Sequence, residues 1–296
     1  MNRIAENTLV SVVIPCYKHE KFVQRCLESV AKQTYENIEV VIVDDCSPDG
    51  SVSEIERLIY SESWQSRFSQ PTQFHPFTKN RGAHAAINYG ISQAKGNIIA
   101  LLNSDDMYHP ERLKAMVSQM QIGGHEFVFS RVQYIDENDR VVTNSHPVAR
   151  DYFRYQKNIK NKQFPSVGFA CLSGNVSIST GNFVFTRSLF KRVGEFNDYR
   201  CCHDWDFLLR SIVDTEPFFL EQDLYYYRFH GKNTFESLVA IGHQESASLL
   251  RNFFSKVQSD WSPNTLAPSQ LNWPGFFELF IHLHGLERFV KDSRIS

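Results

Sequence analysis

The sequence predicts an α/β fold in which helices flank a single, mostly parallel sheet, and three apolar segments support that prediction. Residues 10–15, 38–43 and 98–102 read as strands, and the last of them shows no polar alternation. Such a run suits a strand buried on both faces, as in a parallel sheet covered by helices. Between the three segments the apolar residues recur at helical spacing, so we expect strands and helices to alternate.

Length and charge restrict the class of protein. The chain has 296 residues, which exceeds the usual domain of about 100 to 200, yet α/β domains reach about 250. We therefore expect one domain over residues 1–235 and a helical extension over residues 236–296. A hydrophobic fraction of 42% fits a folded soluble protein, and a net charge of -2 without basic clusters argues against a nucleic-acid partner.

Cysteine usage and hydropathy predict the compartment. The six cysteines show neither paired metal spacing nor the framework of a small secreted scaffold, which favours a reducing compartment. The polar, short opening over residues 1–8 predicts no signal peptide, and no run of about 18 apolar residues predicts a membrane span. We therefore expect a cytoplasmic protein.

The first half of the chain can be assigned in order. Its first strand ends at Pro15, because proline lacks the N–H that a ladder needs. The apolar stripe of the following helix is made by Val23, Cys26, Leu27, Val30 and Ala31. A helix over 51–60 and a short strand over 74–77 follow the second strand. The next helix buries Ala86, Ile87, Gly90, Ile91 and Ala94. Gly96 is placed as its left-handed C-cap.

The second half shows weaker signals. A helix begins near Pro110, and its buried face is made by Leu113, Met116, Val117 and Met120. Residues 127–134 and 141–142 suggest a hairpin, whereas residues 145–173 show no period, a length of irregular chain that often carries function. The remaining expected elements are a strand over 182–186, a helix over 188–193 stopped by Gly194, a helix over 204–213, a strand over 225–229 and two or three C-terminal helices.

Acidic residues stand where two of the expected strands end. Asp44 and Asp45 follow the second strand, and Asn103-Ser104-Asp105-Asp106 follows the strand over 98–102. Ligands of parallel sheets bind beyond the carboxyl ends of the strands. Hard carboxylate oxygens there suit a magnesium or manganese ion that bridges a diphosphate. The alternative is that the acids only open a turn and cap the next helix.

Six short motifs, in order, resemble those of family 2 glycosyltransferases with the GT-A fold. They are VVIPCY at 12–17, VIVDDCS at 41–47, NRG at 80–82, NSDD at 103–106, HDWD at 203–206 and YRFH at 227–230. The resemblance covers about residues 9–235. It implies transfer of a sugar from a nucleotide-diphosphate donor to an acceptor hydroxyl, with inversion at the anomeric carbon and a divalent metal, Mn²⁺ or Mg²⁺.

The nucleotide is expected at the ends of the first two strands. Asp45 can accept the imide N–H of a uracil, which favours a UDP-sugar, although a turn carboxylate is the alternative. Tyr17 can stack on the base or cover the sheet end, and Pro15 can line the same pocket. Arg81, at a helix start, can meet the donor phosphate or remain a surface arginine.

The metal and the ribose are expected at the end of the strand over 98–102. The resemblance places Ser104 and Asp105 in nucleotide binding and Asp106 in direct metal coordination. His230 would be a further metal ligand, because imidazole binds manganese, and its alternative is a histidine bonded to loop backbone. The family more often has an acid where Asn103 stands, which weakens the expected ligand set.

Asp204 is the expected general base. Displacement at the anomeric carbon needs a carboxylate opposite the diphosphate to take the acceptor proton. The alternative is an acid placed at a helix start by the macrodipole alone. The family commonly has Glu where His203 stands. Trp205 is either an acceptor platform or core, and Asp206 is expected to be structural.

Two rival functions remain open from the sequence. A nucleotidyltransferase would also use paired acids and a metal, but the residues after the first strand are not a glycine-rich, basic phosphate loop. A non-catalytic sugar-nucleotide or glycan-binding module would keep the fold without the chemistry.

The expected partners are a nucleotide sugar and a glycan or lipid-linked acceptor. No Gln-x-x-Arg-Trp pattern follows Asp206, which argues against a processive synthase. The aromatic run over 273–283 could touch the inner face of a membrane, dock on the catalytic domain, or join two copies in a homodimer.

Overall fold

The structure is a computed structural model that describes residues 4–5, 7–143, 157, 164–231, 239–259 and 262–292. The strands are β1 (Val10–Cys16), β2 (Ile38–Asp44), β3 (Gln73–Pro76), β4 (Ile98–Leu101), β5 (Met107–Tyr108), β6 (Phe127–Ile135), β7 (Val184–Thr186) and β8 (Phe218–Arg228). The helices are α1 (Val23–Ala31), α2 (Ser51–Ile59), α3 (Glu62–Arg67), α4 (Ala83–Gln93), α5 (Arg112–Gly123), α7 (Val167–Cys171), α8 (Arg187–Val193), α9 (His203–Asp214), α11 (Val239–Ser259), α12 (Phe276–Leu283) and α13 (Glu287–Asp292). A short 3-10 helix, η1, spans Thr180–Asn182.

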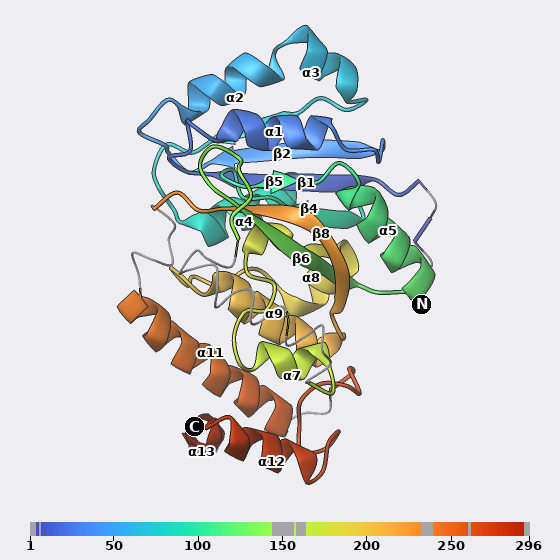
Figure 1. The fold of residues 1–296 in the computed structure, drawn as a ribbon, viewed down its shortest axis with the longest axis vertical. Coiled ribbons are helices and arrows are strands. Elements are labelled where there is room, and N and C mark those ends of the chain that lie inside the picture. Colours follow the sequence, from blue (N-terminus) through green and yellow to red (C-terminus); the bar gives the residue numbers. More distant parts are fainter. Residues whose placement is uncertain are drawn as a thin grey trace.

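One mixed sheet organises the described residues, as the sequence predicts. Its strand order is β3-β2-β1-β4-β7-β6-β8-β5. The first four strands in that order pair in parallel, β7 pairs antiparallel with both β4 and β6, and β8 pairs parallel with β6 and antiparallel with β5. Figure 1 shows α2 and α3 at one end of the molecule and α11, α12 and α13 at the other, with the sheet between them.

Both faces of the sheet are covered, which explains the unbroken apolar strands. Val12 and Ile14 pack with α1, α2 and α5 in one hydrophobic cluster, whereas Val13 packs with α4, α9, α11 and α12 in the other. Alternate side chains of a strand point to opposite faces, so a strand with a helix layer on each side must be apolar throughout.

Two local predictions in the first half need correction. The sequence reading missed α3, whose six residues bury only Trp64. Gly96 is not a left-handed C-cap, because α4 ends at Gln93 and the residue that caps it, Ala94, is extended. The chain passes so close to β1 at this point that a Cβ on Gly96 would lie 2.6 Å from the carbonyl oxygen of Leu9. Close backbone approach therefore requires this glycine.

The second half departs further from expectation. The predicted hairpin is present but short: Ile135 and Val141 form one antiparallel bridge, and the N–H of Val142 donates to the Tyr134 carbonyl at 2.8 Å. Most of β6 pairs with β8, and its first two residues pair with β7. Helix α7 lies within the segment over 145–173 that had no assignable period, and residues 145–156 and 158–163 of that segment lie outside the described residues. Gly194, at a φ of 89°, ends α8 as predicted.

The aromatic C-terminal run docks on the rest of the chain. Phe277, Phe280 and Ile281 of α12 are buried in the same hydrophobic cluster as α7 and α9. The ring of Phe280 lies 4.8 Å from that of Phe169 in α7. One of the three expected roles, docking on the preceding domain, is thus confirmed for this face of the helix. The proposed division at residues 235 and 236 falls among residues that the structure does not describe, so it stays a prediction.

Candidate active site

Asp45 lies where β2 ends and ties that strand to the start of α4. Its two carboxylate oxygens accept backbone N–H groups from Arg81, at 2.6 Å, and Gly82, at 2.8 Å. Burial raises the pKa of the Asp45 carboxyl, and these two amide bonds oppose that rise. The carboxylate therefore has a structural role, and each oxygen keeps a further lone-pair site for a ligand.

The other expected base-pocket residues border Asp45. Pro15 pairs with Val43 in the parallel β1–β2 ladder, so it lies at the same sheet edge. Tyr17 is 37% exposed and carries the Lys18 ammonium 4.8 Å from its ring centre. The exposed Arg81 guanidinium lies over the Phe77 ring. These residues leave an aromatic face and a cation open to solvent beside Asp45.

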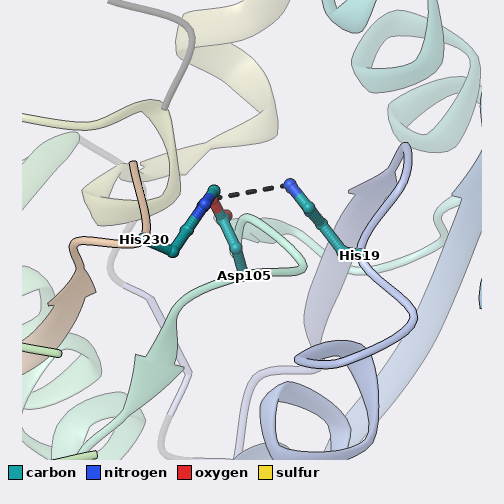
Figure 2. A group of neighbouring side chains, drawn as sticks. All are labelled: His19, Asp105 and His230. Atoms are coloured by element: carbon teal, nitrogen blue, oxygen red, sulfur yellow. Dashed lines mark hydrogen bonds and ion pairs between the residues drawn. The ribbon is translucent and has the colours of Figure 1, made fainter. Parts of the chain in front are cut away.

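Three side chains from distant parts of the chain converge near the end of β4, as Figure 2 shows. His230 Nε2 lies 3.0 Å, and His19 Nε2 3.6 Å, from Oδ2 of Asp105. Among the described residues this is the one group of three or more histidine, cysteine or acidic side chains whose ligand atoms all lie within 4.8 Å of one another. Ser104 lies beside it, 2.8 Å from Nδ1 of His19.

The cluster fits a divalent cation. Burial alone would raise the pKa of the Asp105 carboxyl, but the imidazoles of His19 and His230 outweigh it and bring that pKa down to about 2. Asp105 is thus a carboxylate across the physiological range. One carboxylate and two imidazoles are a donor set that suits manganese and similar ions, which complete their shell with water and phosphate oxygens.

Asp106 has a setting that differs from the predicted one. Its oxygens accept the Tyr225 hydroxyl, at 2.5 Å, and the backbone N–H of Arg228, at 2.8 Å. Burial and the neighbouring Asp105 charge raise its pKa well above the usual carboxyl value. Asp106 therefore fastens the end of β8, which places His230 two residues later, while Asp105 faces the imidazoles.

A short segment, residues 175–182, connects this cluster to the start of α9. The amide of Asn103 donates to Ser179 Oγ at 2.9 Å, a bond that the more usual aspartate could not give. Ser179 Oγ also lies 3.3 Å from the Tyr225 hydroxyl. Thr180 Oγ1 meets Nε2 of His203 at 3.2 Å. The loop that carries Asp105 and the start of α9 are therefore linked through two neighbouring residues of this segment.

The link depends on a glycine within η1. A Cβ on Gly181 would lie 2.0 Å from the Tyr225 hydroxyl oxygen and 2.7 Å from the backbone nitrogen of Asn103. Any side chain would force these groups apart. The sequence contains Gly181 between two polar residues without a turn signature, so its role was not foreseen.

Asp204 stands in the first turn of α9. Its Oδ2 accepts the amide of Asn175 at 2.7 Å, and its Oδ1 accepts the backbone N–H of Trp205. Burial raises the pKa of the Asp204 carboxyl to about 7. A carboxylate with such a pKa can take a proton near neutral pH, which is the property required of a general base.

A residue of α11 holds the turn before Asp204 through hydrogen bonds. The Glu245 carboxylate accepts three backbone N–H groups: Arg200 at 2.8 Å, and Cys201 and Cys202 at 2.9 Å each. The charge of Glu245 also adds to the rise of the Asp204 pKa, after burial. His203 is neutral at pH 7, because burial lowers its pKa to about 4.

Known proteins resemble this chain in sequence and fold. The profile described as Glycosyl transferase family 2 matches residues 11–193. An uncharacterized glycosyltransferase of Nostoc sp. (strain PCC 7120), alr2836, is 26% identical over 241 residues, 80% of this chain and 70% of that protein. The Escherichia coli protein WfgD, named UDP-Glc:alpha-D-GlcNAc-diphosphoundecaprenol beta-1,3-glucosyltransferase, is 29% identical over 168 residues, 57% of this chain and 60% of its own length.

Two solved structures share the fold. S. aureus TarS 1-349 in complex with UDP-GlcNAc gives a TM-score of 0.63 at 19% identity, covering 85% of this chain and 67% of that one. The mannosyltransferase PcManGT of Pyrobaculum calidifontis, in complex with GDP-Man and Mn²⁺, gives a TM-score of 0.63 at 17% identity. The match covers 97% of this chain and 73% of that one. In the described residues no helix is both long and apolar enough for a membrane crossing.

Proposed function

The chain belongs to glycosyl transferase family 2, and from that premise we propose that it moves the sugar of a UDP-sugar, with inversion, to a hydroxyl of a glycan or lipid-linked saccharide. It is a glycosyltransferase of the kind that uses nucleotide sugars. The observation that carries the finer proposal is the link, through residues 175–182, between the His19–Asp105–His230 cluster and Asp204. The UDP-dependent name of WfgD and the UDP-GlcNAc complex of TarS support the choice of nucleotide.

We assign the cation site to His19, Asp105 and His230, in place of the predicted pair Asp106 and His230. Mn²⁺ or Mg²⁺ bound there would neutralise charge on the departing diphosphate. Asp106 keeps its neighbours in position, since it is buried, accepts hydrogen bonds from Tyr225 and Arg228, and has a pKa raised well above the usual carboxyl value, which disfavours the charged form that a cation binds. The Mn²⁺ complex of PcManGT supports a metal in this fold.

The donor lies, in this proposal, along the carboxyl edge of the sheet. Tyr17 and Pro15 pack against the base, and Asp45 accepts its imide N–H through a lone pair that the backbone amides leave free. Arg81 meets a phosphate, and Ser104 and Asp105 border the ribose and diphosphate. Pro15 lies near the end of β1, Arg81 lies just before α4, and the others come from the loops that follow β1, β2 and β4.

Asp204 takes the acceptor proton as the hydroxyl attacks the anomeric carbon. The Asn175 amide and the Trp205 N–H fix the carboxylate, and burial sets its pKa near 7. As the pH falls below about 7 the carboxyl is protonated and cannot act as base, so transfer slows on the acidic side.

Release of free nucleotide tests the proposal. The protein is incubated with UDP-glucose, UDP-GlcNAc and GDP-mannose in turn, with Mn²⁺ or with EDTA, and UDP or GDP is quantified. We expect slow UDP release that requires the metal. Release of GDP alone would move the donor assignment to a GDP-sugar, and release that EDTA leaves unchanged would remove the cation from the mechanism.

A further inference from the structure

A pocket of about 310 Å³ lies between the α9 turn and the C-terminal helices. Its lining comes from the residues that follow α7, from the first turn of α9 and from α11. The rest comes from the short connection after α12 and from α13. We call it the α11 pocket. Its volume is at the lower end of the range for small-molecule sites and suits one sugar or one phosphate group.

The pocket is joined to the proposed base on two sides. Trp205, in its wall, follows Asp204 directly in α9. Ser173, also in its wall, stands two residues before Asn175, whose amide holds the Asp204 carboxylate at 2.7 Å. A ligand in the pocket therefore borders the same two segments that position the base.

The polar lining is basic. Arg288, His243 and His284 line the pocket, and none of the described residues in its wall is acidic. Arg288 is exposed, with its guanidinium carbon 4.5 Å from the centre of the Phe289 ring. An exposed guanidinium, with no carboxylate among the described lining residues, favours a phosphate oxygen as partner.

The apolar lining offers flat faces. The indole N–H of Trp205 already donates to the Cys171 carbonyl at 2.8 Å, so the ring presents its faces and edges to the pocket. Nδ1 of His284 lies 2.9 Å from the Phe280 carbonyl, which fixes the proton on that nitrogen and leaves Nε2 as an acceptor for a hydroxyl. Aromatic faces, a hydroxyl acceptor and a cation together suit a sugar that carries a phosphate.

We propose that the α11 pocket is an acceptor subsite that receives the phosphate of a sugar phosphate whose hydroxyl is turned toward Asp204. The inference rests on the proposed role of Asp204 as base. The phosphate could belong to a soluble sugar phosphate or to a lipid carrier. Leu279 and Leu283 of α12, which are 52% and 69% exposed, precede His284 by five residues and by one residue and would accompany a lipid chain.

Binding without turnover tests the proposal. The indole N–H signal of Trp205 is followed by nitrogen-15 NMR in the full chain and identified through Trp205→Phe, while glucose 1-phosphate, glucose or dodecyl phosphate is added. We expect glucose 1-phosphate to shift this signal and to bind about tenfold or more tightly than glucose, because a charge-assisted bond to Arg288 is gained. Equal affinities for the two sugars would overturn the proposal.

Two variants and a matched control sharpen the result. Arg288→Gln should weaken the binding of glucose 1-phosphate about tenfold or more. Ala247→Phe, which fills the pocket from α11, should abolish the shift of the Trp205 signal. Lys191→Gln removes an exposed charge of α8 outside the pocket and should bind as the parent does. Unchanged binding in Arg288→Gln would refute the subsite.

The probes also separate the sources of the phosphate. Tighter binding of dodecyl phosphate than of glucose 1-phosphate identifies a lipid carrier, and the reverse order identifies a soluble sugar phosphate. Since neither donor, metal nor turnover enters this measurement, a failure of UDP release would count against the proposed function and against the acceptor role of the pocket, while phosphate binding in the pocket would still stand.

Discussion

The two sides of the site are held together differently. At the strand edge, defined as residues 15–19, 44–45 and 103–106, Asp44 bonds the hydroxyl and amide of Ser47 three residues away. At the α9 turn, residues 200–204, three backbone N–H groups bond to Glu245, 43 to 45 residues later in the chain. The strand edge is also tied to elements that adjoin the sheet, through Asp45 to the start of α4 and through Asp106 to the end of β8. The α9 turn is instead held by a separate helix, α11.

The strand edge and the α9 turn also differ in where variation can enter such an enzyme. The family profile ends at residue 193, so Asp204, His230 and Glu245 all lie beyond the matched range. The strand edge, which we assign to the donor, lies within it. Because the α9 turn is bonded to α11, substitutions in α11 can reposition it while the sheet stays intact. Such substitutions would act on the side that we assign to the acceptor.

The largest effect is expected at the α9 turn. Asp204→Asn should lower transfer by about 10²- to 10⁴-fold, because the amide cannot take the acceptor proton, and should leave UDP affinity unchanged. Turnover is measured with donor and acceptor, and UDP binding by calorimetry. Asp214→Asn, at the other end of α9 and bonded to Arg192, is the matched control. Full turnover in Asp204→Asn would remove it as the base.

The second largest effect is expected at the strand edge, where the dependence on metal should change. Asp105→Asn removes the charged member of the cluster, so the Mn²⁺ concentration for half-maximal UDP release should rise about tenfold or more. Asp223→Asn, which loses an ion pair with Arg131 on β6, serves as control and should keep the parental Mn²⁺ requirement. Equal requirements in both variants would place the cation elsewhere.

The segment that joins the two sides can be disturbed without replacing a residue of either side. Gly181→Ala should destabilise the protein by about 1 to 3 kcal/mol, since the new Cβ collides with Tyr225 and with the backbone of Asn103. Urea unfolding measures the loss. Gly231→Ala is the control for a glycine with a left-handed φ of 67° but open space around it. Equal losses in the two variants would show that the close contact at Gly181 has no energetic weight.

The sequence predicted the strand edge well because its signals are local. Apolar strands that end in acids locate Asp45 and Asp105, and a strand that ends in histidine locates His230. The resemblance favoured Asp106 as the direct metal ligand, whereas the geometry leads us to propose Asp105, since two adjacent carboxylates look alike until the backbone direction after β4 is known. His19 was missed although it follows the first strand by only a few residues, which is a usable signal.

The α9 turn could be predicted only in part. Asp204 was identified through its motif, whereas Asn175 and Glu245 were not. Glu245 bonds to backbone N–H groups, which every residue except proline carries, so nothing in the partner sequence marks the contact. The segment that contains Asn175 was recognised only as the edge of an irregular region.

The smallest predicted effect separates two roles of Glu245. Glu245→Gln keeps the shape and one acceptor oxygen but removes the charge that adds to the rise of the Asp204 pKa. A lower pKa leaves Asp204 deprotonated at lower pH, so the acidic limb of the pH–rate profile should move below 7 by less than about one unit. Glu278→Gln, an exposed acid on α12, should keep the parental profile. If Glu245→Gln lowers the rate equally at every pH, the residue braces the turn without tuning the base, and the electrostatic link between α11 and Asp204 is refuted.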